Sequence, residues 1–104
     1  MQTTDFRKLQ IWQLSLDLCQ DIYRLTAMFP KTEMFGITSQ MRRAAVSISS
    51  NIAEGAGRSS IRQFSYFISI SIGSSCELET QLVISKRLEY ISESDFKATE
   101  QHTR

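Results

Sequence analysis

The sequence contains few of the residues that end helices or make turns. Among its 104 residues there are one proline and four glycines, too few for the many turns of an all-β domain. No apolar run approaches the ~20 residues of a membrane span, and the opening "MQTTDFRKLQIW" lacks the basic-then-apolar order of a signal peptide. We therefore expect one helical domain over residues 1–104 that makes no contact with a membrane.

Cysteine and histidine are equally scarce. Cys19 and Cys76 lie far apart, a spacing that fits neither a Cys-x-x-Cys metal site nor a disulfide framework. We interpret them as buried, reduced thiols of a cytoplasmic protein. The one histidine, His102, has no second histidine for a metal and no partnered serine or cysteine. We therefore expect no catalytic residue, no metal, no cofactor and no small-molecule substrate, and so no enzyme.

Charge of one sign is not in excess over the whole chain, but it is unevenly spread. The net charge is only +1, which by itself does not indicate a nucleic-acid-binding protein. Residues 31–76 carry five basic and two acidic side chains, whereas residues 77–104 carry four basic and six acidic ones. The basic part supplies our candidate nucleic-acid contacts, which are Arg42, Arg43, Arg58 and Arg62.

Helical spacing of apolar residues runs along nearly the whole chain. In residues 6–29 apolar side chains recur every three or four positions, and Pro30 ends this helix because proline disfavours helical geometry in the residue before it. A second helix is predicted over residues 38–54, with Thr38 as its N-cap and Gly55 as its C-terminal stop. Short connections between helices indicate antiparallel neighbours, and hence an all-α, up-and-down four-helix bundle.

The third predicted helix is the longest and has apolar residues on nearly every side. It begins at Ser59 or Ser60, where Ser60 and Gln63 form a capping-box pattern, and continues to about Ile91. A helix that is apolar all round is buried all round, which a small monomer cannot achieve for its longest helix. We infer that the chain associates with copies of itself.

A fourth helix can begin at Ser92 or Ser94, but it is short. Only 13 residues follow Ile91, or about 20 Å of helix, and Phe96 is the only large apolar anchor among them. We expect a stub or a frayed helix, so that a neighbouring chain covers part of the apolar surface of the third helix.

One carboxylate, Glu77, falls on an apolar stripe of the third helix. The other members of that stripe include Tyr66, Ile70, Ile84 and Leu88. An unpaired charge there would be costly. We interpret Glu77 as half of a structural ion pair with Arg42 or Arg43, in preference to a catalytic acid or base.

The segment "EGAGRSS" allows two interpretations. A phosphate-binding Walker loop needs Gly-x-x-x-x-Gly-Lys-Ser/Thr after a strand, whereas this segment has no such lysine and follows a helix. A glycine stop followed by a serine start is ordinary helix punctuation. The alternative is that free N–H groups at the start of the third helix, flanked by Arg58 and Arg62, hold an RNA phosphate.

Four segments together resemble a known family. They are "FRKLQIWQLSLDLCQDIYRLT", "FPKTEMFGITS", "QMRRAAVSISSNIAEGAGRSS" and "FSYFISISIGSSCELETQL". Over about residues 5–91 the chain is similar to the bacterial four-helix bundle proteins, also called 23S rRNA intervening-sequence proteins. The blocks "RRAAVSI–NIAEG" and "GSSCELE" are the specific ones. The resemblance implies an antiparallel four-helix bundle that assembles as a homopentamer without enzymatic activity.

The same family includes the accessory variability determinant of diversity-generating retroelements, a basic pentamer that binds the element's reverse transcriptase and RNA. The chain departs from the family in having only "SESDFKATEQHTR" after Ile91, where members generally have a full-length fourth helix. It also lacks the strong basic excess of the retroelement accessory proteins.

Two functions remain open at this level. The first is an RNA- or nucleoprotein-binding assembly factor, with a reverse transcriptase as one partner that the resemblance implies. The second is a purely structural oligomer that binds a protein partner and whose arginines form internal ion pairs. Arginines exposed on the surface would favour the first function, and arginines paired with Glu77 or Glu54 would favour the second.

Overall fold

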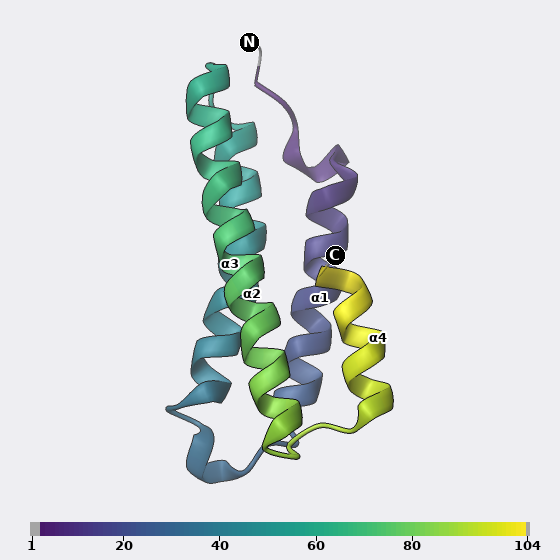
Figure 1. The fold of residues 1–104 in the computed structure, drawn as a ribbon. Coiled ribbons are helices and arrows are strands. Elements are labelled where there is room, and N and C mark those ends of the chain that lie inside the picture. The colour runs from purple at the N-terminus through teal and green to yellow at the C-terminus, as the bar shows by residue number, and fades with distance from the viewer. Residues whose placement is uncertain (1–2, 104) are drawn as a thin grey trace.

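Four α-helices run up and down along the long axis of the molecule (Figure 1). The computed structural model describes residues 3–103, and side chains as far as residue 101. The helices are α1 (Gln10–Thr26), α2 (Ile37–Ala56), α3 (Ile61–Arg87) and α4 (Glu93–Thr103). Two 3₁₀ turns, η1 (Phe6–Lys8) and η2 (Lys31–Glu33), precede α1 and α2. The predicted all-α bundle with a short fourth helix is confirmed.

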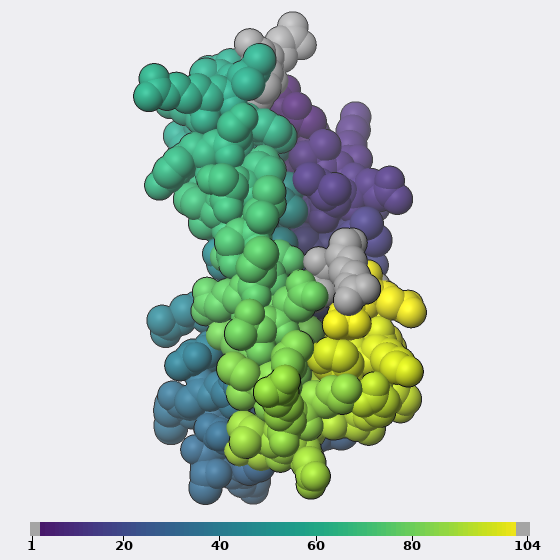
Figure 2. Space-filling model, in the orientation of Figure 1, coloured from purple at the N-terminus to yellow at the C-terminus, as the bar shows by residue number. Residues whose placement is uncertain are grey.

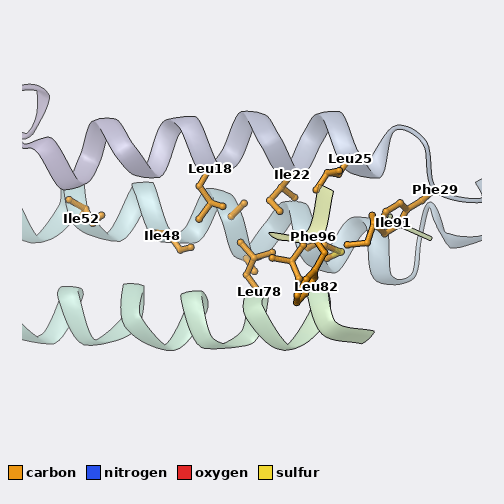
Figure 3. Packing of buried hydrophobic residues seen from close by; sticks show 13 residues of the cluster. Leu18, Ile22, Leu25, Phe29, Ile48, Ile52, Leu78, Leu82, Ile91 and Phe96 are labelled. Carbon is orange, nitrogen blue, oxygen red and sulfur yellow. The ribbon is translucent and has the colours of Figure 1, made fainter. Parts of the chain in front are cut away.

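The core is one cluster of apolar side chains on the inward faces of all four helices (Figure 3). The helices contribute Leu18, Ile22, Leu25, Met41, Ala44, Ala45, Ile48, Ile52, Leu78, Leu82 and Phe96. Phe29 and Ile91, from the two connections at one end of the bundle, complete it. Each large side chain stabilises the fold by about 1.5–3 kcal/mol when fully buried, so this cluster holds α1, α2 and α3 together and anchors α4.

Small residues line the contacts of α2 with α1 and α3. Ser49 in α2 forms a hydrogen bond of 2.8 Å with Ser15 in α1, and Ser71 in α3 donates to the carbonyl oxygen of Ile48 at 3.0 Å. Because serine is short and the hydroxyls of these serines have hydrogen-bond partners, the helices approach closely at these positions. The Ala- and Ser-rich sequence of α2 is therefore a packing surface on two sides.

The predicted start of the first two helices needs correction. Residues 6–8 form η1, and the α-helix begins only at Gln10. Gly36, not Thr38, is the N-cap of α2. Thr38 is consequently inside the helix and buried, and its hydroxyl has no hydrogen-bond partner.

The predicted C-terminal stop at Gly55 is wrong. Helix α2 continues through Gly55 to Ala56, and Gly57 is its C-cap. A Cβ atom added to Gly55 would lie 3.1 Å from the Cβ of Phe67 and 3.3 Å from the carbonyl oxygen of Phe64. Glycine at this position therefore allows α3 to pack closely against the end of α2 and does not end the helix.

The start of α3 matches the sequence-based prediction, but its end does not. Ser60 accepts a hydrogen bond of 3.0 Å from the backbone N–H of Gln63, as expected for an N-cap. The helix ends at Arg87, before the predicted Ile91. The N–H of Tyr90 donates to the carbonyl of Ser85 and Glu89 has a positive φ of 64°, which together form a Schellman-type end that turns the chain back to the core.

Helix α4 is short and packs against only one end of the bundle. Ser92 accepts from the N–H of Asp95 at 3.2 Å, and Phe96 is buried between the other helices with the Nζ of Lys86 4.8 Å from its ring centroid. Figures 1 and 2 show α4 beside one half of α1 and α3, with the other half of that face left uncovered.

The cysteines are both free, but only one is partly buried. Cys19 is half-buried, and burial raises the pKa of its thiol. Cys76 is exposed on α3, so the prediction of two buried thiols is wrong for this residue. Its place on an outward face of α3 shows that this helix is not covered all round within one chain.

Candidate interaction surfaces

Arg42 is tied to the end of α1. Its Nε donates to the Oγ1 of Thr26 at 2.8 Å, and its guanidinium lies 4.7 Å over the ring of Tyr23. One terminal nitrogen also lies 3.4 Å from the carbonyl oxygen of Tyr23, in the last turn of α1, where a cation is favoured by the helix dipole. Arg42 therefore links α2 to α1 through contacts within the chain.

Arg43 points away from that contact. It follows Arg42 by one residue, which on an α-helix is a rotation of about 100°, and its side chain is exposed. It lines an open hollow of about 640 Å³ on the outer side of α2. The rim and floor of this surface, hereafter the α2 hollow, include Tyr23, Met34, Phe35, Val46 and Ser50.

Four exposed apolar or aromatic side chains line the α2 hollow, together with polar residues. Phe35 is 97% exposed, and Met34, Tyr23 and Val46 are also exposed. Single exposed apolar residues are common on proteins, whereas several around one hollow indicate a contact surface. The hollow thus combines an exposed cation with apolar side chains, the combination that interfaces favour.

Arg58, just beyond the opposite end of α2, also makes contacts within the chain. It donates to the Oε2 of Glu54 at 2.9 Å, and its guanidinium lies 4.9 Å over the ring of Phe67. Arg62, in the first turn of α3, is exposed. Among the four candidate arginines, Arg42 and Arg58 are thus held by contacts within the chain, whereas Arg43 and Arg62 face solvent.

The four candidate arginines do not form one patch. Arg42 and Arg43 lie in the second turn of α2, whereas Arg58 follows the C-cap Gly57. Thirteen residues of α2 come after Arg43, or about 20 Å of helix. Any partner that met all four arginines would have to run along the full length of α2.

The predicted ion pair between Glu77 and Arg42 or Arg43 is not formed within the chain. Glu77 is exposed, and its Oε1 accepts from the Nε2 of Gln81 at 3.2 Å. The stripe to which Glu77 belongs turned out to be the outward face of α3, whereas the prediction required it to face α2. The inward face of α3 carries Ser71, Leu78, Leu82 and Ser85 instead.

The outward face of α3 is the second apolar surface. Tyr66, Ile84 and Leu88 are 60%, 44% and 50% exposed. Hereafter we call this face the α3 ridge; it consists of Tyr66, Ile70, Gly73, Glu77, Ile84 and Leu88. A Cβ atom added to Gly73 would meet no atom within 4 Å, so nothing inside the chain requires a glycine at the middle of this helix.

A third apolar surface lies beyond the end of α4. It is a groove of about 280 Å³ between α1 and α3, floored by α2. Ile11 and Leu14 from α1 and Ile72 from α3 are exposed along it, and its floor includes Ile48 and Ile52. This is the uncovered half of the face that Figure 2 shows beside α4.

The described part of the chain offers neither a metal site nor a membrane-spanning helix. Among residues 3–101, no group of three or more His, Cys, Asp or Glu side chains lies close enough to hold a metal ion. The side chain of His102 lies outside the described part. In the same part of the chain, none of the helices combines the length and the apolar character needed to cross a bilayer.

The described part of the chain is a helical-bundle protein with exposed apolar side chains and with two exposed candidate arginines, Arg43 and Arg62. The sequence model of the 23S rRNA-intervening sequence proteins matches residues 7–104. The chain belongs to this family. No curated protein matches the chain.

Proposed function

We propose that this protein acts by assembling with copies of itself into a scaffold that binds a macromolecular partner, without catalysing a reaction. The observation that carries the proposal is the α3 ridge, on which Tyr66 near one end and Ile84 and Leu88 near the other are exposed, with Gly73 and Glu77 between them. Several exposed apolar side chains on one face of a helix mark a contact surface. A homopentamer, which the family resemblance implies, is the assembly we expect.

Sedimentation velocity at micromolar concentration tests the assembly. We expect a species close to five times the chain mass of 11.9 kDa. Ile84→Glu, which places a charge on the α3 ridge, should dissociate it. Met28→Glu is the matched control, because Met28 is also exposed but lies in the connection after α1. A wild-type chain that sediments as a monomer would overturn the proposal.

RNA is a second candidate partner, because Arg62 faces solvent at the start of α3. Repetition of this cation over several copies would give a multivalent surface for phosphates. The more specific form of this candidate is an accessory role beside a reverse transcriptase, as the resemblance implies. Arg42 and Arg58 make contacts within the chain, which argues against their binding RNA. A protein partner is therefore the alternative.

Retention on single-stranded RNA at increasing salt separates these candidates. Each neutralised phosphate contributes roughly 0.7 to the slope of log affinity against log salt. Arg62→Ala should lower that slope, whereas Arg7→Ala, at an exposed arginine outside the candidate set, should leave it unchanged. No retention of wild type at low salt would eliminate RNA and favour a protein partner. Co-purification with a reverse transcriptase would be needed to support the accessory role.

A further inference from the structure

The α2 hollow and the α3 ridge are opposite in shape and in charge. The hollow is concave, is lined in part by small residues such as Ser39 and Ser50, and carries the exposed cation of Arg43 beside the half-buried Arg42. The ridge is a straight apolar helix face that carries the carboxylate of Glu77. We propose that the α3 ridge of one copy seats in the α2 hollow of the next, with Glu77 facing Arg43 across the contact. This inference rests on the proposed self-assembly and specifies its surfaces.

Charge complementarity is the first argument. Neither side chain has an oppositely charged partner among the described residues: Glu77 accepts only from the neutral amide of Gln81, and Arg43 lies in the open hollow. Opposite charges placed across an apolar interface fix the register of two partners and exclude wrong ones. Every chain carries both the hollow with Arg43 and the ridge with Glu77. A second copy can therefore supply the missing partner for either charge.

Gly73 supplies an independent argument. Glycine within a helix is destabilising relative to alanine, and nothing in the chain would obstruct a Cβ at this position. It lies one helical turn before Glu77, at the middle of the α3 ridge. A missing side chain there lets a facing helix approach closely, so a partner seated on the ridge explains a glycine that the single chain does not.

The two surfaces cannot meet within one chain. Helices α2 and α3 pack side by side, and the Oγ of Ser47, which also lines the α2 hollow, accepts from Ser74 at 2.9 Å. The side of α3 that faces the core carries Ser71, Leu78 and Leu82, and the α3 ridge is on another side of the helix. The pairing is therefore between different surfaces of two copies. Repetition of such a head-to-tail contact closes into a ring when the rotation allows it.

Charge reversal tests the pairing directly. Glu77→Arg and Arg43→Glu should each weaken association by at least about tenfold, because like charges would then face each other. The double variant Glu77→Arg with Arg43→Glu should recover association. Mixing the two single variants should also restore association between them, because each then offers the surface that the other lacks. Gly73→Leu should weaken association in a chain that remains helical by circular dichroism.

Glu79→Arg is the matched control. Glu79 is two residues from Glu77 on the same helix but about 200° around it, so its reversal should leave association unchanged. Equal association of wild type and both single variants would overturn the pairing while leaving the assembly itself intact. A monomeric wild type would instead overturn the proposed self-assembly. Weak single variants that are not restored by the double variant or by mixing would also refute this contact.

Discussion

Arg58 donates to Glu54 at 2.9 Å while its guanidinium lies 4.9 Å over the ring of Phe67. The two contacts join the last turn of α2 to the first turns of α3 across the connection between them. A residue that sequence alone places beside a free helix N-terminus is thus part of the joint between two helices. Arg62, four residues further on, has the exposure that a phosphate contact requires.

Replacement of Arg58 should therefore affect stability more than replacement of Arg62. Arg58→Ala removes an exposed i,i+4 ion pair and a cation–π contact, so we expect a loss of about 0.5–1 kcal/mol in the free energy of unfolding. Arg62→Ala should change it by less than about 0.5 kcal/mol. Urea denaturation at one protein concentration measures both, and equal losses would contradict the assignment.

Gly55 and Gly73 should respond in opposite directions to the same substitution. Within a helix, alanine is favoured over glycine by about 0.5–1 kcal/mol. Gly73→Ala should gain this stability in dilute, dissociated chains, because its Cβ meets nothing. Gly55→Ala should be destabilising, because its Cβ would lie 3.3 Å from a backbone oxygen of Phe64. Thermal denaturation of the two variants side by side is the measurement, and a gain at both positions would refute the close-approach role of Gly55.

The end of α3 offers a stabilising substitution. Glu89 has a φ of 64°, a conformation that costs about 1 kcal/mol for a residue with a side chain and little for glycine. Glu89→Gly should therefore raise the free energy of unfolding by up to about 1 kcal/mol. Glu89→Ala keeps the Cβ atom and should leave it nearly unchanged. If both variants behaved alike in urea denaturation, backbone strain at this position would not be the cause.

Burial of Phe96 should be needed to keep α4 packed against α1 and α3. It is the large buried side chain of α4, and full burial of phenylalanine is worth about 1.5–3 kcal/mol. Phe96→Ala should speed hydrogen exchange across residues 93–101 while α1, α2 and α3 keep their protection. Lys97→Ala, at the exposed neighbouring position, serves as the control. Unchanged exchange in Phe96→Ala would show that other contacts hold this helix.

Acid should loosen the start of α4. The Lys86 ammonium, 2.6 Å from Glu93, holds the pKa of that carboxyl below its ordinary value of 4.5. A carboxyl with a lowered pKa in the fold stabilises it fully above pH 4.5 and loses this contribution as the pH falls through the lowered value. Circular dichroism of wild type and Glu93→Gln during acid titration should show this loss in wild type alone. The same acid response in both would assign it to other carboxyl groups.

The sequence was sufficient to predict the bundle and several of its helix ends. Regular spacing of apolar residues and the Ser60 cap of α3 are local signals, because each depends on backbone chemistry within one or two turns. The end of the first helix was predicted less well, since α1 ends at Thr26, before the predicted end next to Pro30. The short fourth helix and its Ser92 cap follow from the same rules. Family membership likewise depends on residue identities that can be quoted from the sequence.

Only the tertiary structure decided which sides of the helices face inward. Periodicity fixes the angles between residues on one helix, but a helix that is apolar all round, such as α3, has no unique orientation about its own axis. For this reason Glu77 was expected to pair with an arginine of α2 but is exposed on the outer face of α3. For the same reason the sequence did not show that Arg42 is partly buried while the adjacent Arg43 is exposed. The role of Gly55 could not be predicted for a related reason. Glycine is required there because Phe64 and Phe67 of another helix pack closely against this position.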